Sequence, residues 1–286
     1  LVGFTRYEGL FSILVIGILF ILRRRLLQSV CLGGLGVLPI AIYGAISVLN
    51  GWDFLPNPIL LKAGIPEFSQ RGMLKFLFRF IERVVDTPYV FTLLLIALLL
   101  FVLQFNKKKT LWKDSTIMLA VFIATTLLHL LFARTGWFYR YEAYLVGLGI
   151  FVIAAVLHEY IPERKSIKLS KHLLPKFLAI VLLTFIVILP FARRGAGSLI
   201  KTPQATKNIY EQQYQMGLFL RKFYEDGVVA ANDIGAINYL ADIKCVDLWG
   251  LGSLEVSKLR KERNYHTRDI YRLAKRKNVK IAIVYD

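Results

Sequence analysis

The chain has 286 residues, 56% of them hydrophobic, and its formal net charge is +18. This composition excludes an ordinary soluble domain, because such domains hold about 45–50% apolar residues. The basic residues are scattered among apolar stretches, which argues against a nucleic-acid partner and favours anionic lipid surfaces and phosphate-bearing ligands. The sequence therefore predicts a polytopic α-helical membrane protein.

The chain begins at Leu1 inside an apolar pattern that lacks the features of a signal peptide, so we expect a fragment whose N-terminal part is missing. About six stretches are predicted to cross a hydrocarbon layer of roughly 30 Å as helices. They cover residues 9–22 (extended back to Gly3), 26–49, 89–105, 115–132, 141–157 and 173–191.

Two further segments separate the second and third spans. Residues 50–72 are rich in Pro, Gly and Asn, which predicts an extramembrane loop. Residues 73–85 alternate basic and large apolar side chains with a helical period, which predicts an amphipathic helix in the interface.

The distribution of Lys and Arg predicts the orientation. Short basic loops follow the first, third and fifth spans, at Arg23, Lys107 and Lys165, and the positive-inside rule places them in the cytoplasm. The C-terminal domain is then extracytoplasmic. We expect the protein in a bacterial cytoplasmic (inner) membrane.

The C-terminal part, residues 195–286, has the character of a water-soluble domain, which leaves residues 1–194 as the transmembrane helical domain. Strands predicted at 228–231, 244–248 and 280–285 alternate with helices, which favours a small α/β domain with a mainly parallel sheet. Cys31 and Cys245 fall in a span and a strand, so no disulfide framework is predicted.

A dense polar packet, 129–145, joins the fourth and fifth spans with the sequence HLLFARTGWFYRYEAYL. Its Tyr and Trp rings suit an aromatic belt at the membrane boundary. Arg134, Arg140 and Glu142 are less well explained in that way, because ionisable groups at the mouths of spanning helices usually face a polar cavity or a ligand. Both interpretations remain open at this stage.

Three segments carry a family resemblance. FTRYEGLFSILVIGILFILRRR resembles the "TRPEG" segment, span and basic stop of bacterial membrane glycosyltransferases of the GT-C superfamily, with Tyr7 where Pro is common. LPNPILLKAG resembles their "PNxxxxK" loop, and ANDIGAINYLADIKCVDLWGLGS resembles their extracytoplasmic "DxGAIxY...VDLxGL" segment. The three resemblances follow in the expected order and span nearly the whole chain.

The resemblance implies transfer of a sugar from a polyprenyl-phosphate carrier to a glycan, lipid or protein acceptor at the outer face. It also implies that the catalytic carboxylate lies in the first extracytoplasmic loop, before Leu1. Within the chain, Asp53 and Glu142 are the carboxylates that could do acid–base work, or they could be ion-pair partners. The rival interpretation is a non-enzymatic transporter or carrier of lipid-linked glycans, which would also need cations inside a bundle.

Such a donor needs cations for phosphate, hydrogen-bonding groups for sugar and apolar surface for the prenyl tail. Arg140, Arg134 and Arg6 could bind the phosphate, although Arg6 could instead pair with Glu8 or reach the interface. A last group could contact substrate or serve only structure: Asn57, Lys62, Tyr141 and His129.

No cofactor motif stands out in the sequence. A divalent metal has no supporting ligand pattern either, since His129 has no second ligand at metal-site spacing.

Overall fold

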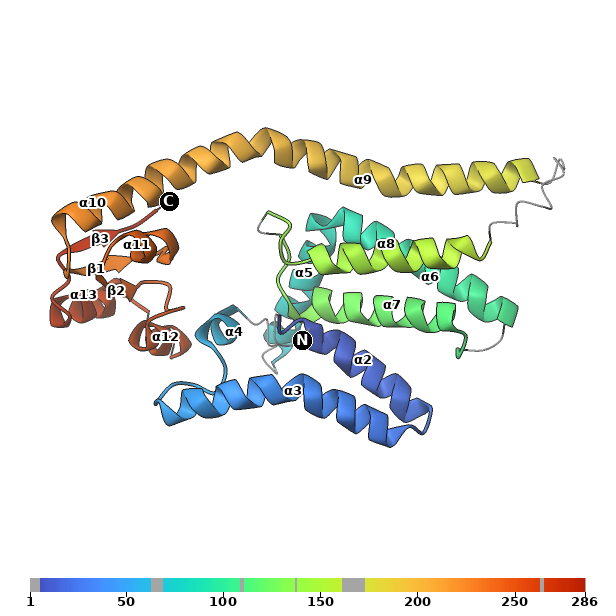
Figure 1. Ribbon diagram of the computed structural model, residues 1–286, viewed down its shortest axis with the longest axis horizontal. Coiled ribbons are helices and arrows are strands. Elements are labelled where there is room, and N and C mark those ends of the chain that lie inside the picture. Colours follow the sequence, from blue (N-terminus) through green and yellow to red (C-terminus); the bar gives the residue numbers. More distant parts are fainter. Residues whose placement is uncertain are drawn as a thin grey trace. The chain divides into compact units, whose positions relative to one another are not determined.

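The computed structural model describes residues 6–62, 69–108, 111–136, 138–160, 173–262 and 265–285. The chain is mostly helical and contains a small parallel sheet near its C-terminus (Figure 1). It divides into two compact units. The first comprises Leu1–Ala41 with Ala63–Ala196, and the second comprises Ile42–Lys62 with Gly197–Asp286.

The helices of the first unit are α2 (Gly9–Leu22), α3 (Leu26–Leu49), α5 (Gln70–Asp86), α6 (Pro88–Lys108), α7 (Asp114–Phe132), α8 (Ala143–His158) and α9 (Leu173–Asn208), of which α3 and α9 continue into the second unit. Within the described residues, three helices are long and apolar enough to cross a membrane, namely α3, α6 and α7, while α2 and α8 are shorter apolar helices. The predicted count of six spans stays a prediction.

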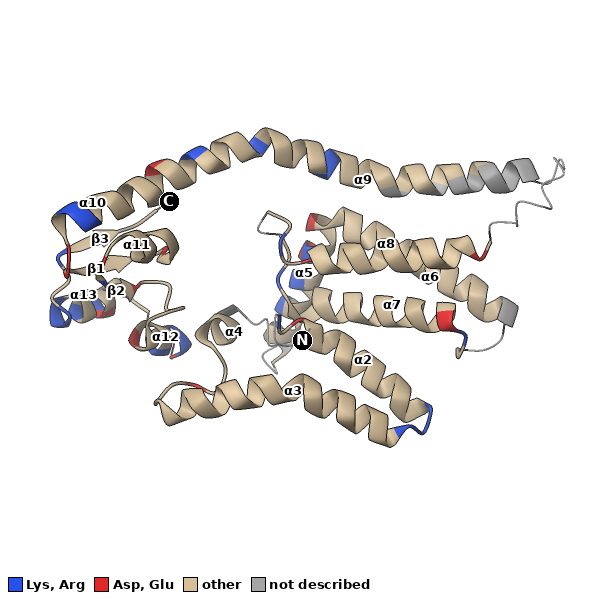
Figure 2. Ribbon diagram, in the orientation of Figure 1, with Lys and Arg blue, Asp and Glu red and all other residues tan. Residues whose placement is uncertain are grey.

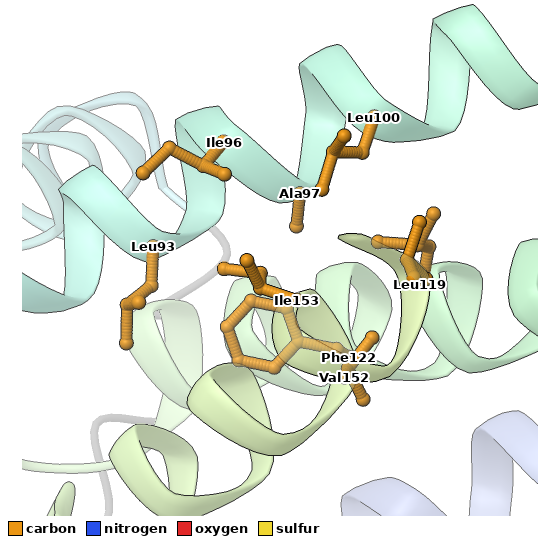
Figure 3. Close-up of a cluster of buried hydrophobic side chains, with 9 residues drawn as sticks. Leu93, Ile96, Ala97, Leu100, Leu119, Phe122, Val152 and Ile153 are labelled. Carbon is orange, nitrogen blue, oxygen red and sulfur yellow. The ribbon is translucent and has the colours of Figure 1, made fainter. Parts of the chain in front are cut away.

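The core of the first unit lies between α6, α7 and α8, which pack against one another. Phe122 from α7 is completely buried there, beside Leu93 from α6 and Val152 from α8 (Figure 3). A buried glycine of α8, Gly149, lies directly against the Phe122 ring. Close packing of this kind can hold apolar helices together in lipid, where the hydrophobic effect does not drive their association.

Helix α2 packs on α7, and the hydroxyls of Ser12 and Thr125 lie 3.4 Å apart across that interface. The start of α2 lies near the polar packet, because Arg6 donates to the carbonyl of Arg140. The end of α2 lies near the start of α7, because Arg23 donates to the carbonyl of Trp112. The two helices therefore run antiparallel, as Figure 1 shows.

Helix α5 begins with a side-chain cap, since the Ser69 hydroxyl accepts from the amide of Gly72 at 3.0 Å. One side of α5 packs on α6 and α7, where Phe76 contacts Phe132 with ring centroids 5.7 Å apart. Its position agrees with the helix predicted over 73–85.

The loop predicted over 50–72 was wrong in part, because α4 (Asn57–Lys62) forms within it. Pro58 occupies its first turn, where a missing amide hydrogen costs nothing.

The second unit contains the predicted parallel sheet. Its strands are β1 (Val228–Ala231), β2 (Lys244–Asp247) and β3 (Ile281–Ile283), in the order β2-β1-β3 with both pairings parallel. The remaining helices are η2 (Ile209–Tyr214, a π-helix), α10 (Gln215–Phe223), α11 (Gly235–Leu240), α12 (Leu254–Lys261) and α13 (Thr267–Arg276).

Alternate residues of β1 pack into two separate cores. Val229 and Ala231 join the core that holds Leu220 of α10 and Ile237 of α11. Ala230 joins the opposite core, which holds residues of α12 and α13. The sheet is thus covered on both faces, as parallel sheets require. Both cysteines of the chain are free, as predicted.

Replacing Gly149 with Ala is expected to lower the melting temperature of the detergent-solubilised protein. The new Cβ would lie 2.6 Å from Cζ of Phe122, whose ring is fully buried and cannot swing aside. Overpacking of this kind costs about 1–3 kcal/mol. Gly147→Ala in the same helix is the matched control, since no atom lies within 4 Å of its added Cβ. Equal melting temperatures for the two variants would contradict the packing described.

Candidate functional site

The packet predicted from the sequence forms a connected polar cluster at one end of the first unit's helices. Arg6 enters it from the residues before α2, where one guanidinium nitrogen donates to the carbonyl of Arg140 at 3.0 Å. Its other terminal nitrogen pairs with Glu8 at 3.2 Å. The guanidinium also lies 5.9 Å from the ring centroid of Tyr144, within range of a cation–π contact.

His129 is completely buried in the last turn of α7. Its Nε2 lies 3.1 Å from the carbonyl oxygen of Arg134, and its Nδ1 lies 3.0 Å from the Tyr144 hydroxyl. A carbonyl can only accept, so Nε2 carries the hydrogen. In the neutral imidazole, Nδ1 then accepts from Tyr144. His129 thereby joins the end of α7 to the start of α8, and both ring nitrogens are engaged.

Glu142 is completely buried just before α8. One carboxylate oxygen accepts from the Tyr89 hydroxyl at the start of α6. The other accepts from the amide of Gly136 at 3.0 Å. A buried carboxylate needs such donors, and Glu142 uses them to fasten the α7–α8 connection to α6.

The α7–α8 connection holds an unusual backbone. Gly136 has φ of +84°, while Phe138 and Tyr139 are non-glycine residues with φ of +57° and +63°. Consecutive side-chain-bearing residues in the left-handed region are strained and persist only where their surroundings hold them. One such restraint is Arg194 of α9, which donates to the carbonyl of Tyr139 at 3.3 Å.

The guanidinium of Arg194 is held between two aromatic rings. It lies 4.5 Å from the ring centroid of Tyr89 and 4.3 Å from that of Tyr139. Cation–π contacts on two rings fix the guanidinium plane and leave some of its N–H groups available.

A cavity of about 460 Å³ opens beside Arg194. Its basic side chains come from Arg193 and Arg194, and its apolar wall comes from Leu189 and Pro190 of the same helix. The remaining lining residues are Asp86, Pro88, Tyr89 and Tyr139.

Arg83 adds a further positive charge at the end of α7. The Nη1 of its guanidinium donates to the carbonyls of Leu130 and Leu131 at 2.8 and 2.6 Å, so a cation caps the negative end of the helix. Partial burial lowers the pKa of Arg83 from its ordinary value, and the nearby charges of Arg79 and Arg134 lower it further. Arg83 therefore adds to the cations that Arg6 and Arg194 contribute to the cluster.

The structure brings together most of the residues predicted for the site. Arg6, His129, Glu142 and the backbone of Arg134 belong to the cluster, while the side chain of Arg134 is exposed. Arg140 is exposed too, and its guanidinium lies 3.4 Å from the Tyr141 hydroxyl and 5.2 Å from that ring's centroid.

Other predicted residues lie elsewhere. Asn57 and Asp53 belong to the second unit, where Asp53 forms an ion pair with Lys261 of α12. Lys62 ends α4, but its side chain lies outside the described residues, as does Trp137. The roles assigned to these residues stay predictions.

Sequence reasoning missed Arg193 and Arg194. They follow the predicted sixth span at the very end of the predicted transmembrane domain and were given no role, whereas α9 continues without interruption to Asn208. The pair RR directly after the apolar run FIVILPFA is the signal that could have drawn attention to them.

Comparison with known proteins gives one match. A family model described as a domain of unknown function (DUF8728) matches residues 207–286, which cover η2 and the α/β part of the second unit. No curated protein and no solved structure matches the chain.

Replacing Tyr89 with Phe is expected to destabilise the first unit, because it removes a donor from a carboxylate that stays buried. Leaving a buried polar group without a partner costs about 1–3 kcal/mol. Tyr141→Phe is the control, since the Tyr141 hydroxyl contacts only the exposed Arg140 within the described residues. Thermal unfolding in detergent measures both. A Tyr89→Phe protein as stable as the control would refute the structural role of the Tyr89–Glu142 bond.

Proposed function

We propose that this chain belongs to a membrane glycosyltransferase of the GT-C type, which transfers a sugar from a polyprenyl-phosphate carrier to an acceptor outside a bacterial cytoplasmic membrane. The three sequence resemblances motivate the proposal. Three helices long and apolar enough to span a bilayer are consistent with it.

The observation that carries the proposal is the cavity beside Arg194. A sugar-linked polyprenyl phosphate carries one negative charge, shared by two phosphate oxygens, on a long apolar tail, so its site must place cations next to apolar surface. Arg193 and Arg194 supply the cations, and Leu189 and Pro190 one turn earlier on α9 supply apolar surface. Guanidinium groups bind phosphate oxygens in pairs, which suits them to this task better than ammonium groups.

The arrangement also suits the chemistry of transfer. The acceptor hydroxyl oxygen forms a bond to the anomeric carbon of the sugar, and the bond from that carbon to the phosphate oxygen breaks. The phosphate leaves with the electron pair, so negative charge grows on it. A cation held rigidly before the reaction stabilises that charge without reorganising. Arg194 is held in this way by Tyr89 and Tyr139.

The proton of the acceptor hydroxyl needs a carboxylate base. Glu142 accepts two hydrogen bonds in a buried place, and Asp53 is paired with Lys261, so both carboxylates are occupied in the structure.

Removing the charge of Arg194 is expected to weaken binding of polyprenyl phosphate to the protein in nanodiscs. Charge-assisted hydrogen bonds contribute about 1.5–3 kcal/mol each, so Arg194→Gln should lower affinity roughly 10- to 100-fold and Arg194→Lys less. The control is Arg221→Gln on the exposed side of α10 in the second unit, which removes the same charge. Unchanged affinity in a folded Arg194→Gln protein would refute the phosphate site.

Transfer and transport are separated by the fate of the sugar. In membranes that contain the protein and a labelled polyprenyl-phosphate sugar, a transferase breaks the bond between sugar and phosphate. A transporter moves the intact molecule across the membrane. Recovery of only intact donor on the far side would favour the transporter.

The proposed orientation predicts which cysteines an impermeant thiol reagent reaches in intact cells. With Cys31 and Cys245 replaced by Ser, a cysteine at Tyr239 of the second unit should react, since that side chain is 89% exposed. A cysteine at His158, exposed at the end of α8, should react only after the cells are opened. The opposite pattern would reverse the topology.

A further inference from the structure

The turn between α2 and α3 forms a second basic site, at the end of α2 far from the polar cluster. Arg23, Arg24 and Arg25 make up the whole connection. The amide of Arg25 donates to the carbonyl of Phe20, and that of Arg24 donates to Ile21, both at 2.8 Å. These two bonds close the end of α2 as a Schellman motif.

The left-handed position of that motif is ordinarily occupied by Gly, but here it is Arg24, with φ of +58°. A glycine would fit this backbone without strain. Arg24 instead places a guanidinium at this position, between those of Arg23 and Arg25.

A cavity of about 420 Å³ lies at this turn, lined by the three arginines together with Leu22 and Trp112. Arg23 is fixed in it, because its guanidinium donates to the carbonyl of Trp112 at 2.9 Å and lies 4.7 Å from the indole centroid. Arg24 and Arg25 are exposed and make no side-chain hydrogen bond or ion pair with the part of the chain that the structure describes.

A nearby carboxylate is already engaged. Glu159, at the end of α8, pairs with Lys113 directly after Trp112, and it also accepts from Gln104 at 3.2 Å. The hydrogen bond from Lys113 lowers the pKa of Glu159, so its negative charge belongs to that pair. Within the described residues, Arg24 and Arg25 thus have no carboxylate partner and are available to an added anion.

Apolar side chains surround the basic turn. Leu22 precedes it, and Leu26, Leu27 and Val30 follow it on α3, all of them exposed by 58–77%. A free phosphate ion has no apolar part that could contact these side chains. A molecule with a phosphate and attached acyl chains can contact both the arginines and the leucines.

We propose that the cavity at Arg23–Arg25 binds the phosphate of an anionic phospholipid, with Trp112 beside the headgroup and the acyl chains along α2 and α3. The site is independent of the proposed donor site. Arg24 and Arg25 contact the phosphate, while Arg23 keeps Trp112 in place. Figure 2 shows these basic residues gathered at the end of α2.

The test measures the melting temperature of the purified chain in neutral detergent with added phosphatidylglycerol, phosphatidylcholine or inorganic phosphate. A lipid present at about 100 times its dissociation constant should raise it by roughly 5–10 °C. We expect this rise only with phosphatidylglycerol. A rise of equal size with inorganic phosphate or phosphatidylcholine would overturn the proposal, because the site would then not require both charge and acyl chains.

The variant Arg24→Asn with Arg25→Gln should lose most of the phosphatidylglycerol effect. Asn tolerates a left-handed backbone, so the turn is kept. The matched control, Arg268→Gln with Lys275→Gln, removes two exposed charges from α13 and should keep the full effect. Should the first variant fail to fold, Arg25→Gln alone must still reduce the rise by about half or more. A rise in the folded variant equal to that of the control would refute the site.

Discussion

The buried carboxylate of Glu142 is the interaction on which the first unit's polar end depends. It accepts from Tyr89 at the start of α6 and from Gly136 in the α7–α8 connection, and it lies directly before α8. Two segments far apart in sequence, the start of α6 and the α7–α8 connection, are thus joined through one buried acceptor. Leaving such a group without donors is costly, so the two segments must assemble together.

Arg194 depends on that assembly. Tyr89 holds Glu142 through its hydroxyl and Arg194 through its ring face, so one side chain orients both charges. Because no direct ion pair joins Glu142 to Arg194 in the described residues, the guanidinium keeps hydrogen-bond donors for a ligand. The buried His129 strengthens the end of α7 in a different way, through hydrogen bonds on both ring nitrogens.

Local sequence patterns predicted much of the fold. The strands of the second unit were predicted close to their observed bounds, because short runs that contain Val or Ile and lie between turn-forming Gly, Asn and Asp residues are short-range signals. The apolar runs that form α3, α6 and α7 were recognised because their apolar residues follow one another in the sequence. The length of α9 was not predicted, since the change from apolar to polar residues after Phe191 ends a span without ending a helix.

The site was only partly predictable, because some of its residues meet only through tertiary contacts. Residues 134–142 were recognised because their charges are close together in sequence. Arg194 contacts Tyr89 and Tyr139 only in the folded chain, and no local sequence pattern predicts these contacts. The grouping of Ile42–Lys62 with the C-terminal unit is equally non-local, with Asp53 paired to Lys261 more than 200 residues later.

The spacing of the polar groups in the first unit supports placing it in a bilayer. The polar cluster lies at the end of α7, and Trp112 and Lys113 lie immediately before its start. Nineteen helical residues separate them. At about 1.5 Å per residue they span roughly 28 Å, which matches the hydrocarbon thickness of a membrane. Between these ends, Leu35 and Phe151 expose apolar side chains by 71% and 64%. Water would penalise such surfaces, whereas lipid would not, and the charged groups at both ends would then lie where phosphate groups are most abundant.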